Sequence, residues 1–168
     1  MPDTCPATVP DWPWLMQVFS GSCLLHEDCT IADIVQRVGG GRLAYLATPY
    51  TKLVLDDDRN FDWRAHLKVR VRTSRWAAEL AIEGVTAASP VLMACAICES
   101  GVTGCPHPLD EAFWSRWCQP MLAASGAVIV PPMAGWDVSR GVWREVCWSL
   151  RQNRPVYLIA PPETGGDA

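Results

Sequence analysis

Short apolar runs alternate with longer segments of helical periodicity along this chain. The runs predict buried strands, which lie within 42–51, 90–96, 127–130 and 156–160. The longer segments predict helices over 30–38, from the end of a charged loop at 55–64 to about residue 85, over 110–123 and from 139 to 153. Because strands that alternate with helices pair in parallel, the predicted fold class is α/β, a Rossmann-like or flavodoxin-like parallel sheet with helices on both faces.

The longest predicted helix has one apolar face. Its members recur at helical spacing and are Leu67, Val71, Ser74, Ala78, Ala81 and Val85. The stretch KVRVRT inside this segment also alternates apolar and polar residues, so a strand is the alternative for that part. In the helix predicted over 110–123, Phe113, Trp117 and Met121 are expected to point inward.

A chain of 168 residues, 49% of them hydrophobic, is large enough for one domain with a substantial core. We assign an α/β domain to residues 41–161. Residues 1–40 are expected to form an N-terminal extension that is extended or flexible up to Trp14 and then holds a short helix, which Thr30 caps and the glycines at 39–41 end. Residues 162–168 are expected to be a flexible tail.

One carboxylate stands near the start of the helix in the segment 126–160, between two predicted strands. Ser139 can cap this helix, and Gly141 precedes Glu145 by four residues, or about one turn. The glutamate therefore lies beside a position without a side chain, where a substrate could approach. In open parallel sheets ligands bind at the carboxyl ends of the strands, and the loop before this helix falls at that edge.

The spacing DxSxGxxxE, formed by Asp137, Ser139, Gly141 and Glu145, resembles a motif of the nucleoside 2-deoxyribosyltransferase superfamily, which includes the deoxynucleotide N-glycosidases. The longer stretch GWDVSRGVWREV resembles a branch of that superfamily known as DUF1937. The run RLAYLATPYT at 42–51 is similar to the first strand and loop of the family. The resemblance extends to about residue 161 and does not cover the first forty residues.

The resemblance implies an N-glycosidase or deoxyribosyltransferase that acts on nucleosides or nucleoside 5′-monophosphates. Breaking an N-glycosidic bond creates an oxocarbenium-like sugar, which a carboxylate can stabilise or attack. In the resembled enzymes the glutamate at the position of Glu145 is this nucleophile, and the tyrosine at the position of Tyr45 orients it. The serine at the position of Ser139 binds phosphate in the monophosphate-specific relatives, Asp137 would contact sugar hydroxyls, and the small-residue turn that contains Thr48 would enter the site.

Each of these side chains also has a purely structural interpretation. A glutamate in the first turns of a helix, such as Glu145, is ordinarily solvated, and its negative charge interacts favourably with the positive end of the helix macrodipole. Tyr45 in an apolar strand is ordinarily a core aromatic, and Ser139 can be an N-cap alone. Trp136 is a candidate for stacking on a base or sugar, but the chain has nine tryptophans and most of them must pack. Asp137 can equally belong to a solvated turn.

One departure from the family bears on catalysis. The relatives commonly carry an aspartate on the helix before the strand at 127–130, where it serves in proton transfer or sugar binding. Here Gln119 stands at about that place and Gly126 stands where a second aspartate is common. Neither can act as a general acid, and such help is worth roughly 10² to 10⁴ in rate. Three alternatives follow: the chain is a slow enzyme, it uses another carboxylate, such as Asp110 or Glu111, or it is a catalytically impaired nucleotide-binding or scaffold protein.

The net charge of −4 argues against a general nucleic-acid surface, which needs a basic stripe to neutralise phosphates. The chain shows no basic start followed by an apolar targeting segment, and its longest apolar run is broken by glycines and prolines. We therefore expect a cytoplasmic protein without membrane contact. The resemblance adds a nucleoside or nucleotide as the small-molecule partner, no cofactor, and a homo-oligomer.

Eight cysteines permit a further hypothesis. Cys95, Cys98, Cys105 and His107 follow a CxxC and CxH pattern, and residues 23–29 follow CxxHxxC, so a zinc-stabilised interaction module is conceivable. The spacing after the second cysteine matches no standard zinc module, and a cysteine in a buried strand behaves as a small hydrophobe. We therefore predict no metal.

Overall fold

The computed structural model describes residues 9–38 and 41–161, and the flexible ends expected at 1–8 and 162–168 lie outside this part. Five strands form one all-parallel sheet in the order β1-β5-β4-β2-β3. The strands are β1 (Leu25–Cys29), β2 (Ala44–Leu46), β3 (Ala87–Ala88), β4 (Ala127–Val130) and β5 (Val156–Ile159). The helices are α1 (Trp12–Val18), α2 (Ile31–Val38), the 3-10 helix η1 (Thr51–Val54), α3 (Trp63–Ile82), α4 (Pro90–Glu99), α5 (Glu111–Ala124) and α6 (Arg140–Arg151).

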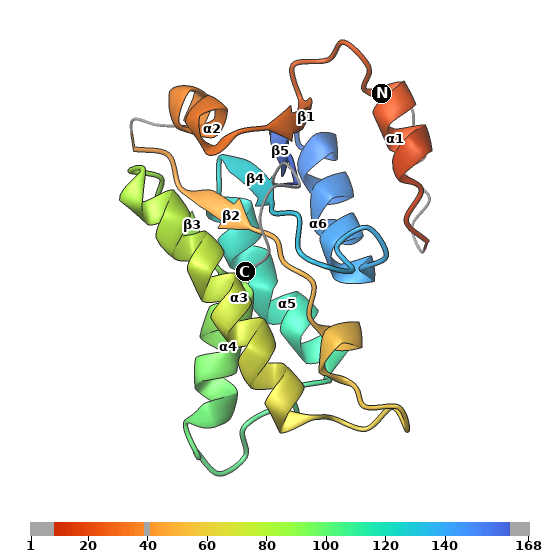
Figure 1. Cartoon of the computed structure of the whole chain (residues 1–168), viewed down its shortest axis with the longest axis vertical. Helices are drawn as coiled ribbons and strands as arrows, with labels where there is room; N and C mark the ends of the chain where they lie inside the picture. The colour runs from red at the N-terminus through yellow and green to blue at the C-terminus, as the bar shows by residue number, and fades with distance from the viewer. Residues whose placement is uncertain (1–8, 39–40, 162–168) are drawn as a thin grey trace.

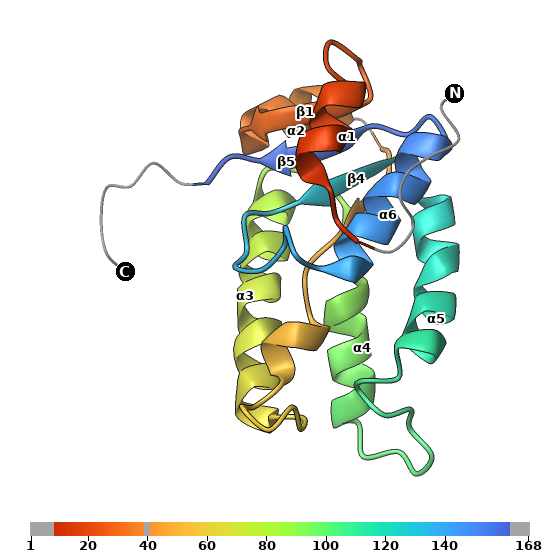
Figure 2. The same ribbon diagram turned by 90° about the vertical axis from the view of Figure 1, so that its right-hand side faces the viewer.

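Helices cover both faces of the sheet, which confirms the predicted α/β class. Val128 and Val130 of β4 pack in a core with α1, α5 and α6, whereas Ala127 and Ile129 face a second core with α2 and α3. Successive side chains of a strand point to opposite faces of the sheet. Because helices cover both faces here, a central strand is apolar on both. Figure 2 shows α3 on one side of β4 and β5, with α5 and α6 on the other.

The predicted unit of strand, helix and strand at 126–160 is confirmed as β4, α6 and β5. The Ser139 side chain caps α6 by accepting a hydrogen bond from the Val142 amide, at 3.4 Å. Asn153 follows the helix with φ of 55°, a left-handed conformation that asparagine tolerates better than most residues. The helix over 110–123 is confirmed as α5, in which Leu122 is buried while Phe113, Trp117 and Met121 are half-buried.

The strand predicted over 90–96 is wrong, because this segment is helix α4, and the strand β3 comes just before it. A short, wholly apolar run fits a buried helix as well as a buried strand, so periodicity alone cannot separate them. Pro90 occupies the first turn of the helix, where its fixed φ is favourable and its missing amide costs no hydrogen bond. Cys95 is buried as expected, but on a helix.

The long helix α3 is confirmed, and KVRVRT is helical. Its predicted face is wrong, since Leu67 and Val71 are 43% and 44% exposed. The buried residues of α3 are His66, Val69, Thr73 and Leu80. Two of these four are polar, so a search for apolar periodicity selected the wrong side of the helix.

The N-terminal region contributes more than the expected extension with a single helix. Residues 12–14, expected to be extended, begin helix α1, and residues 25–29 form strand β1, which pairs with β5 at one edge of the sheet. Glu27 and Asp28 in β1 are exposed, so the strand lacks the apolar run that identified the others. Helix α2 is confirmed with its cap, because Thr30 Oγ1 accepts from the Asp33 amide at 3.1 Å.

Candidate functional site

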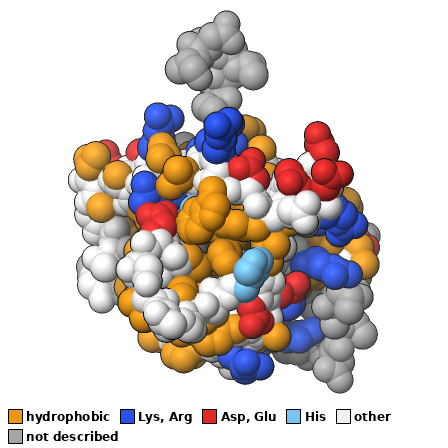
Figure 3. Space-filling view, turned by 90° about the horizontal axis from the view of Figure 1, so that it is seen from below, with side chains coloured by type: hydrophobic (Ala, Val, Ile, Leu, Met, Phe, Trp, Pro, Cys, Tyr) orange, Lys and Arg blue, Asp and Glu red, His pale blue; other side chains and the backbone are white. Residues whose placement is uncertain are grey.

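A cavity of about 720 Å³ is lined by residues of η1, α4, α5 and α6. The chain enters η1 directly after the carboxyl end of β2 (Figure 1). Its wall from η1 and α4 is mostly apolar and includes Leu53, Val91 and Ala94. Figure 3 views the molecule from the end at which α3 begins and α4 ends, where hydrophobic side chains gather at the centre with charged side chains around them. The cavity therefore lies at the sheet edge where the sequence placed a ligand.

Tyr45 and Glu145 meet inside this cavity. The Tyr45 hydroxyl donates a hydrogen bond to Glu145 Oε1 at 2.5 Å, across 100 residues of sequence. Tyr45 is 1% exposed because β2 lies inside the sheet, between β4 and β3, whereas Glu145 is half-buried because one side of it faces the cavity. The predicted pair is thus brought together by the ends of β2 and α6.

The surroundings change how both groups ionise. Burial raises the pKa of Glu145 to about 7, although the hydrogen bond from Tyr45 and the charge of Arg144 act in the opposite direction. Burial and the nearby Glu145 carboxylate raise the pKa of Tyr45 far above its usual value, so its hydroxyl stays a donor. Burial and the nearby Glu145 carboxylate raise the pKa of the Cys118 thiol to about 11. A carboxylate held by a neutral phenol can act as a nucleophile above neutral pH.

The beginning of α6 forms one side of the cavity. Both Ser139 and Gly141 line it, next to Arg140 and Arg144. A methyl group at position 141 would meet Ser139 Oγ at 3.8 Å, an ordinary contact, so no neighbouring atom fills the space that the glycine leaves. Amides at a helix start carry partial positive charge and are suited to an anion.

Thr48 and Gln119 also line the cavity, as predicted for the substrate-binding set. Thr48 is 6% exposed, and among the described residues its hydroxyl has no hydrogen-bond partner. A buried hydroxyl without a partner costs free energy unless a ligand or water satisfies it. Gln119 lies on α5 with an exposed side chain at the cavity rim.

The structure does not bring Trp136 and Asp137 into this cavity. The Trp136 ring packs against the ring of Trp12 at 4.6 Å, with an interplanar angle of 62°. The backbone carbonyl of Asp137 accepts a hydrogen bond from Trp12 Nε1 at 2.6 Å, and its side chain is exposed. Both residues therefore join the loop before α6 to α1, a contact that could not be anticipated because α1 was not predicted.

Sequence reasoning missed the positive charge around the cavity. Five basic side chains line it: Lys52, Arg59, Arg140, Arg144 and Arg151. The two acidic side chains in the lining are Glu145 and Glu111, and the latter pairs with Arg144 at 2.8 Å. Because the basic residues come from η1, the loop after it and α6, no local run in the sequence signals the cluster, and the chain as a whole carries a charge of −4.

The cysteine and histidine residues considered for zinc form other contacts. Across the described ranges 9–38 and 41–161, no group of three or more His, Cys, Asp or Glu side chains converges closely enough to hold a metal ion. Cys105 Sγ contacts the Ile97 carbonyl at 3.4 Å, and His107 Nδ1 accepts a hydrogen bond from the Leu109 amide at 3.2 Å. Within the same ranges, no helix is both long enough and apolar enough to cross a membrane.

Comparison with known families identifies one match. The model of a domain of unknown function, DUF1937, matches residues 42–161, which run from just before β2 to just after β5 and include every residue that lines the cavity. No curated protein matches the chain. Since the matched segment covers well over half of the 168 residues, the chain belongs to the DUF1937 family.

Proposed function

We propose that this protein is an N-glycosidase or 2-deoxyribosyltransferase that acts on nucleosides or nucleoside 5′-monophosphates. The observation that carries the proposal is the hydrogen bond from Tyr45 to Glu145 within a cavity at the carboxyl edge of a parallel sheet. A half-buried carboxylate that a strong donor holds at one oxygen can direct its other oxygen at a substrate. This arrangement fits attack on an anomeric carbon better than it fits a solvated surface glutamate.

The chemistry requires two steps at Glu145. In the first, the carboxylate attacks C1′ of the sugar, the N-glycosidic bond breaks, and its electron pair leaves with the base. In the second, water or an acceptor base attacks the same carbon and releases the carboxylate, so the configuration at C1′ is retained. Tyr45 would hold the attacking carboxylate in position and share its charge after release.

The remaining residues of the cavity support a nucleotide as the ligand. Ser139 and the first amides of α6, with Arg140 close by, provide an anion site for a 5′-phosphate. The apolar wall that includes Leu53 and Val91 is suited to the flat face of a base. The unpartnered Thr48 hydroxyl offers a hydrogen bond to the sugar or the base.

A second function is favoured by one specific observation. Gln119 stands on α5 where the relatives carry an aspartate, and the one carboxylate that α5 contributes to the cavity lining, Glu111, is paired with Arg144 at 2.8 Å. A protein that binds nucleotides without cleaving them would keep the anion site and the apolar wall. This alternative predicts binding of a nucleoside 5′-monophosphate with no release of base.

The test is chromatographic detection of free base. The protein is incubated with ribo- and deoxyribonucleosides and their 5′-monophosphates, with and without an acceptor base, so that transfer is distinguished from hydrolysis. Glu145→Gln should abolish base release, whereas Glu79→Gln, an exposed glutamate on α3, should leave it unchanged. Nucleotide binding by a folded wild-type protein that releases no base from any substrate would establish the alternative.

A further inference from the structure

A second polar network adjoins the cavity and plays no part in the function proposed above. The Tyr50 hydroxyl lies 2.7 Å from Nδ1 of His66, and Nε2 of His66 lies 2.9 Å from Oε1 of Glu99. The other oxygen of Glu99 accepts a hydrogen bond from Arg70 at 2.5 Å. Tyr50 is in the cavity lining, so the network runs from the cavity wall to the surface between α3 and α4.

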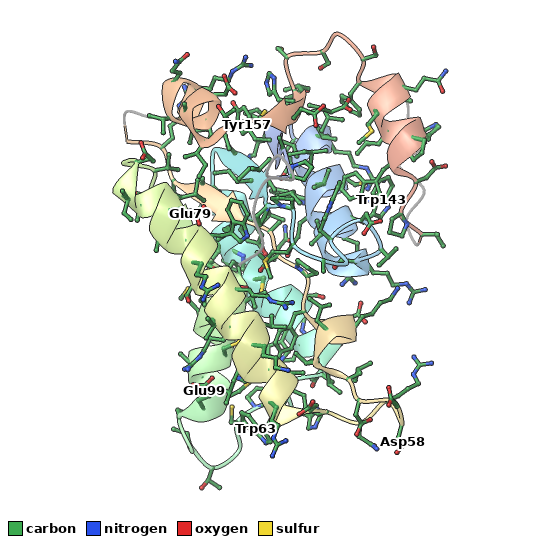
Figure 4. The ribbon with its side chains drawn as sticks, in the orientation of Figure 1. Asp58, Trp63, Glu79, Glu99, Trp143 and Tyr157 are labelled. Atoms are coloured by element: carbon green, nitrogen blue, oxygen red, sulfur yellow. The ribbon has the colours of Figure 1, made fainter. Side chains whose placement is uncertain are left out.

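The imidazole in this network is fully enclosed. His66 is 0% exposed, and the rings of Phe61 and Trp63 pack on it at 5.5 and 4.9 Å. Trp63 and Glu99 lie at the end of the molecule where α3 begins and α4 ends (Figure 4). Both ring nitrogens have partners, which fixes the orientation of the imidazole between Tyr50 and Glu99.

Cleavage of an N-glycosidic bond needs a proton as well as a nucleophile. The departing base is a poor leaving group unless one of its ring nitrogens is protonated as the bond breaks. The residues that α5 offers at the cavity are poorly suited to supply this proton. Gln119 is an amide, the pKa of the Cys118 thiol is raised to about 11, and the Glu111 carboxylate is paired with Arg144 at 2.8 Å. Burial also raises the pKa of Tyr50, so an isolated Tyr50 would be a weak acid and needs a partner that replaces its proton.

We propose that Tyr50 is the proton donor to the leaving base and that His66 replaces its proton from behind. This proposal rests on the N-glycosidase function proposed above. In the reactive state His66 is an imidazolium whose Nδ1–H donates to the Tyr50 oxygen and whose Nε2–H donates to Glu99. As Glu145 bonds to C1′ and the electron pair of the broken bond leaves with the base, the Tyr50 hydroxyl proton moves to a ring nitrogen of the base. The Nδ1 proton of His66 moves to Tyr50 at the same time, which leaves a neutral imidazole.

The second half of the reaction restores the network. Water adds its hydroxide to C1′ and frees Glu145, and the remaining proton returns through Tyr50 to Nδ1 of His66. Protons and electrons balance over the two steps without any further reactant. In this scheme Tyr50 is a catalytic residue, because it contacts the base, while His66 and Glu99 are positioning residues that act through it.

The leaving group itself provides the test. A purine methylated at N7 already carries the positive charge that protonation would create, so its departure needs no acid. Rates of base release above the non-enzymatic rate are measured for 2′-deoxyguanosine 5′-monophosphate and for its N7-methyl derivative. Tyr50→Phe should lower kcat/KM by roughly 10²-fold or more for the unmethylated substrate and leave the methylated one within a few-fold of wild type. His66→Gln should show the same dependence on the leaving group.

Two controls separate this proposal from the function on which it rests. Tyr157→Phe removes a hydroxyl from a buried tyrosine of β5 that does not line the cavity, and it should affect neither substrate. Glu145→Gln should abolish base release from both substrates.

Equal losses of kcat/KM on the two substrates for Tyr50→Phe would overturn the role of Tyr50 while the glycosidase function stands. No release from any nucleotide would overturn both.

Discussion

The protonation of Glu145 links the stability of the fold to pH, and Glu145→Gln isolates this effect. Burial raises the pKa of the carboxyl from 4.5 to about 7 in the folded protein, whereas the unfolded chain keeps the ordinary value. Between these two values the native state holds a proton that the unfolded chain has released. The free energy of unfolding therefore falls as the pH rises through this window and is constant above it.

The size of the effect follows from the shift in pKa. The pKa of Glu145 changes from 4.5 in the unfolded chain to about 7 in the folded protein. At pH 8 this shift lowers the free energy of unfolding of the wild type by about 3 kcal/mol, compared with a variant that has no charge at this position. Glutamine has the same shape, carries no charge, and can still accept the hydrogen bond from Tyr45. The variant should thus be more stable than the wild type by about 3 kcal/mol at pH 8, and the difference should become small near pH 4.5.

Urea denaturation followed by tryptophan fluorescence measures this difference across a series of pH values, and the nine tryptophans provide the signal. Tyr45→Phe provides a matched comparison. This variant lacks the hydrogen bond that lowers the pKa of Glu145, so Glu145 should have a higher pKa in its folded state. The free energy of unfolding of the variant should therefore continue to fall up to a higher pH than that of the wild type. A difference between wild type and Glu145→Gln that is the same at pH 4.5 and pH 8 would show that the charge of Glu145 is not destabilised by burial.

Four further expectations can be checked separately. Base release by the wild type should rise with pH through about 7, because only the ionised Glu145 attacks, and initial rates that are flat from pH 5 to 8 would contradict this. Ser139→Ala should lower the free energy of unfolding by about 1 kcal/mol through loss of the helix cap, and should weaken binding of a nucleoside 5′-monophosphate more than that of the nucleoside, as titration calorimetry would show. Gly141→Ala should raise the melting temperature, with a gain of up to about 1 kcal/mol, since the added methyl group meets no close atom. Ile129→Ala in the central strand should cost about 2 to 5 kcal/mol in denaturant unfolding, whereas Val138→Ala, which is 48% exposed, should change the stability by less than about 0.5 kcal/mol.

The sequence predicted the elements whose pattern is set by local constraints. Strands β4 and β5 are apolar on both faces because each lies inside the sheet, so a continuous apolar run identified them. Helix α6 was predicted from the cap at Ser139 and from its regular apolar spacing. The meeting of Tyr45 with Glu145 was expected from the resemblance to the deoxyribosyltransferase superfamily, not from the pattern of apolar residues.

The errors arose where burial is decided by distant parts of the chain. Helix α4 is apolar because it forms a wall of the cavity, and its composition resembles that of a strand. The buried face of α3 includes His66 because Tyr50 and Glu99 satisfy its ring nitrogens, and no pattern of apolar residues could show this. Strand β1 pairs with β5 although its centre is charged, so it was assigned to an extension.

The residues outside the family segment support the site without lining the cavity. Trp12 of α1 packs on Trp143 at 5.1 Å and donates its indole proton to the carbonyl of Asp137, two residues before the Ser139 cap. The contact holds α6 at Trp143, which itself lines the cavity together with Glu145. Helix α1 therefore limits how far the start of α6 can move when an anion binds there. The position of Glu145 in this chain is set both by the hydrogen bond from Tyr45 and by the tryptophan contacts that hold α6.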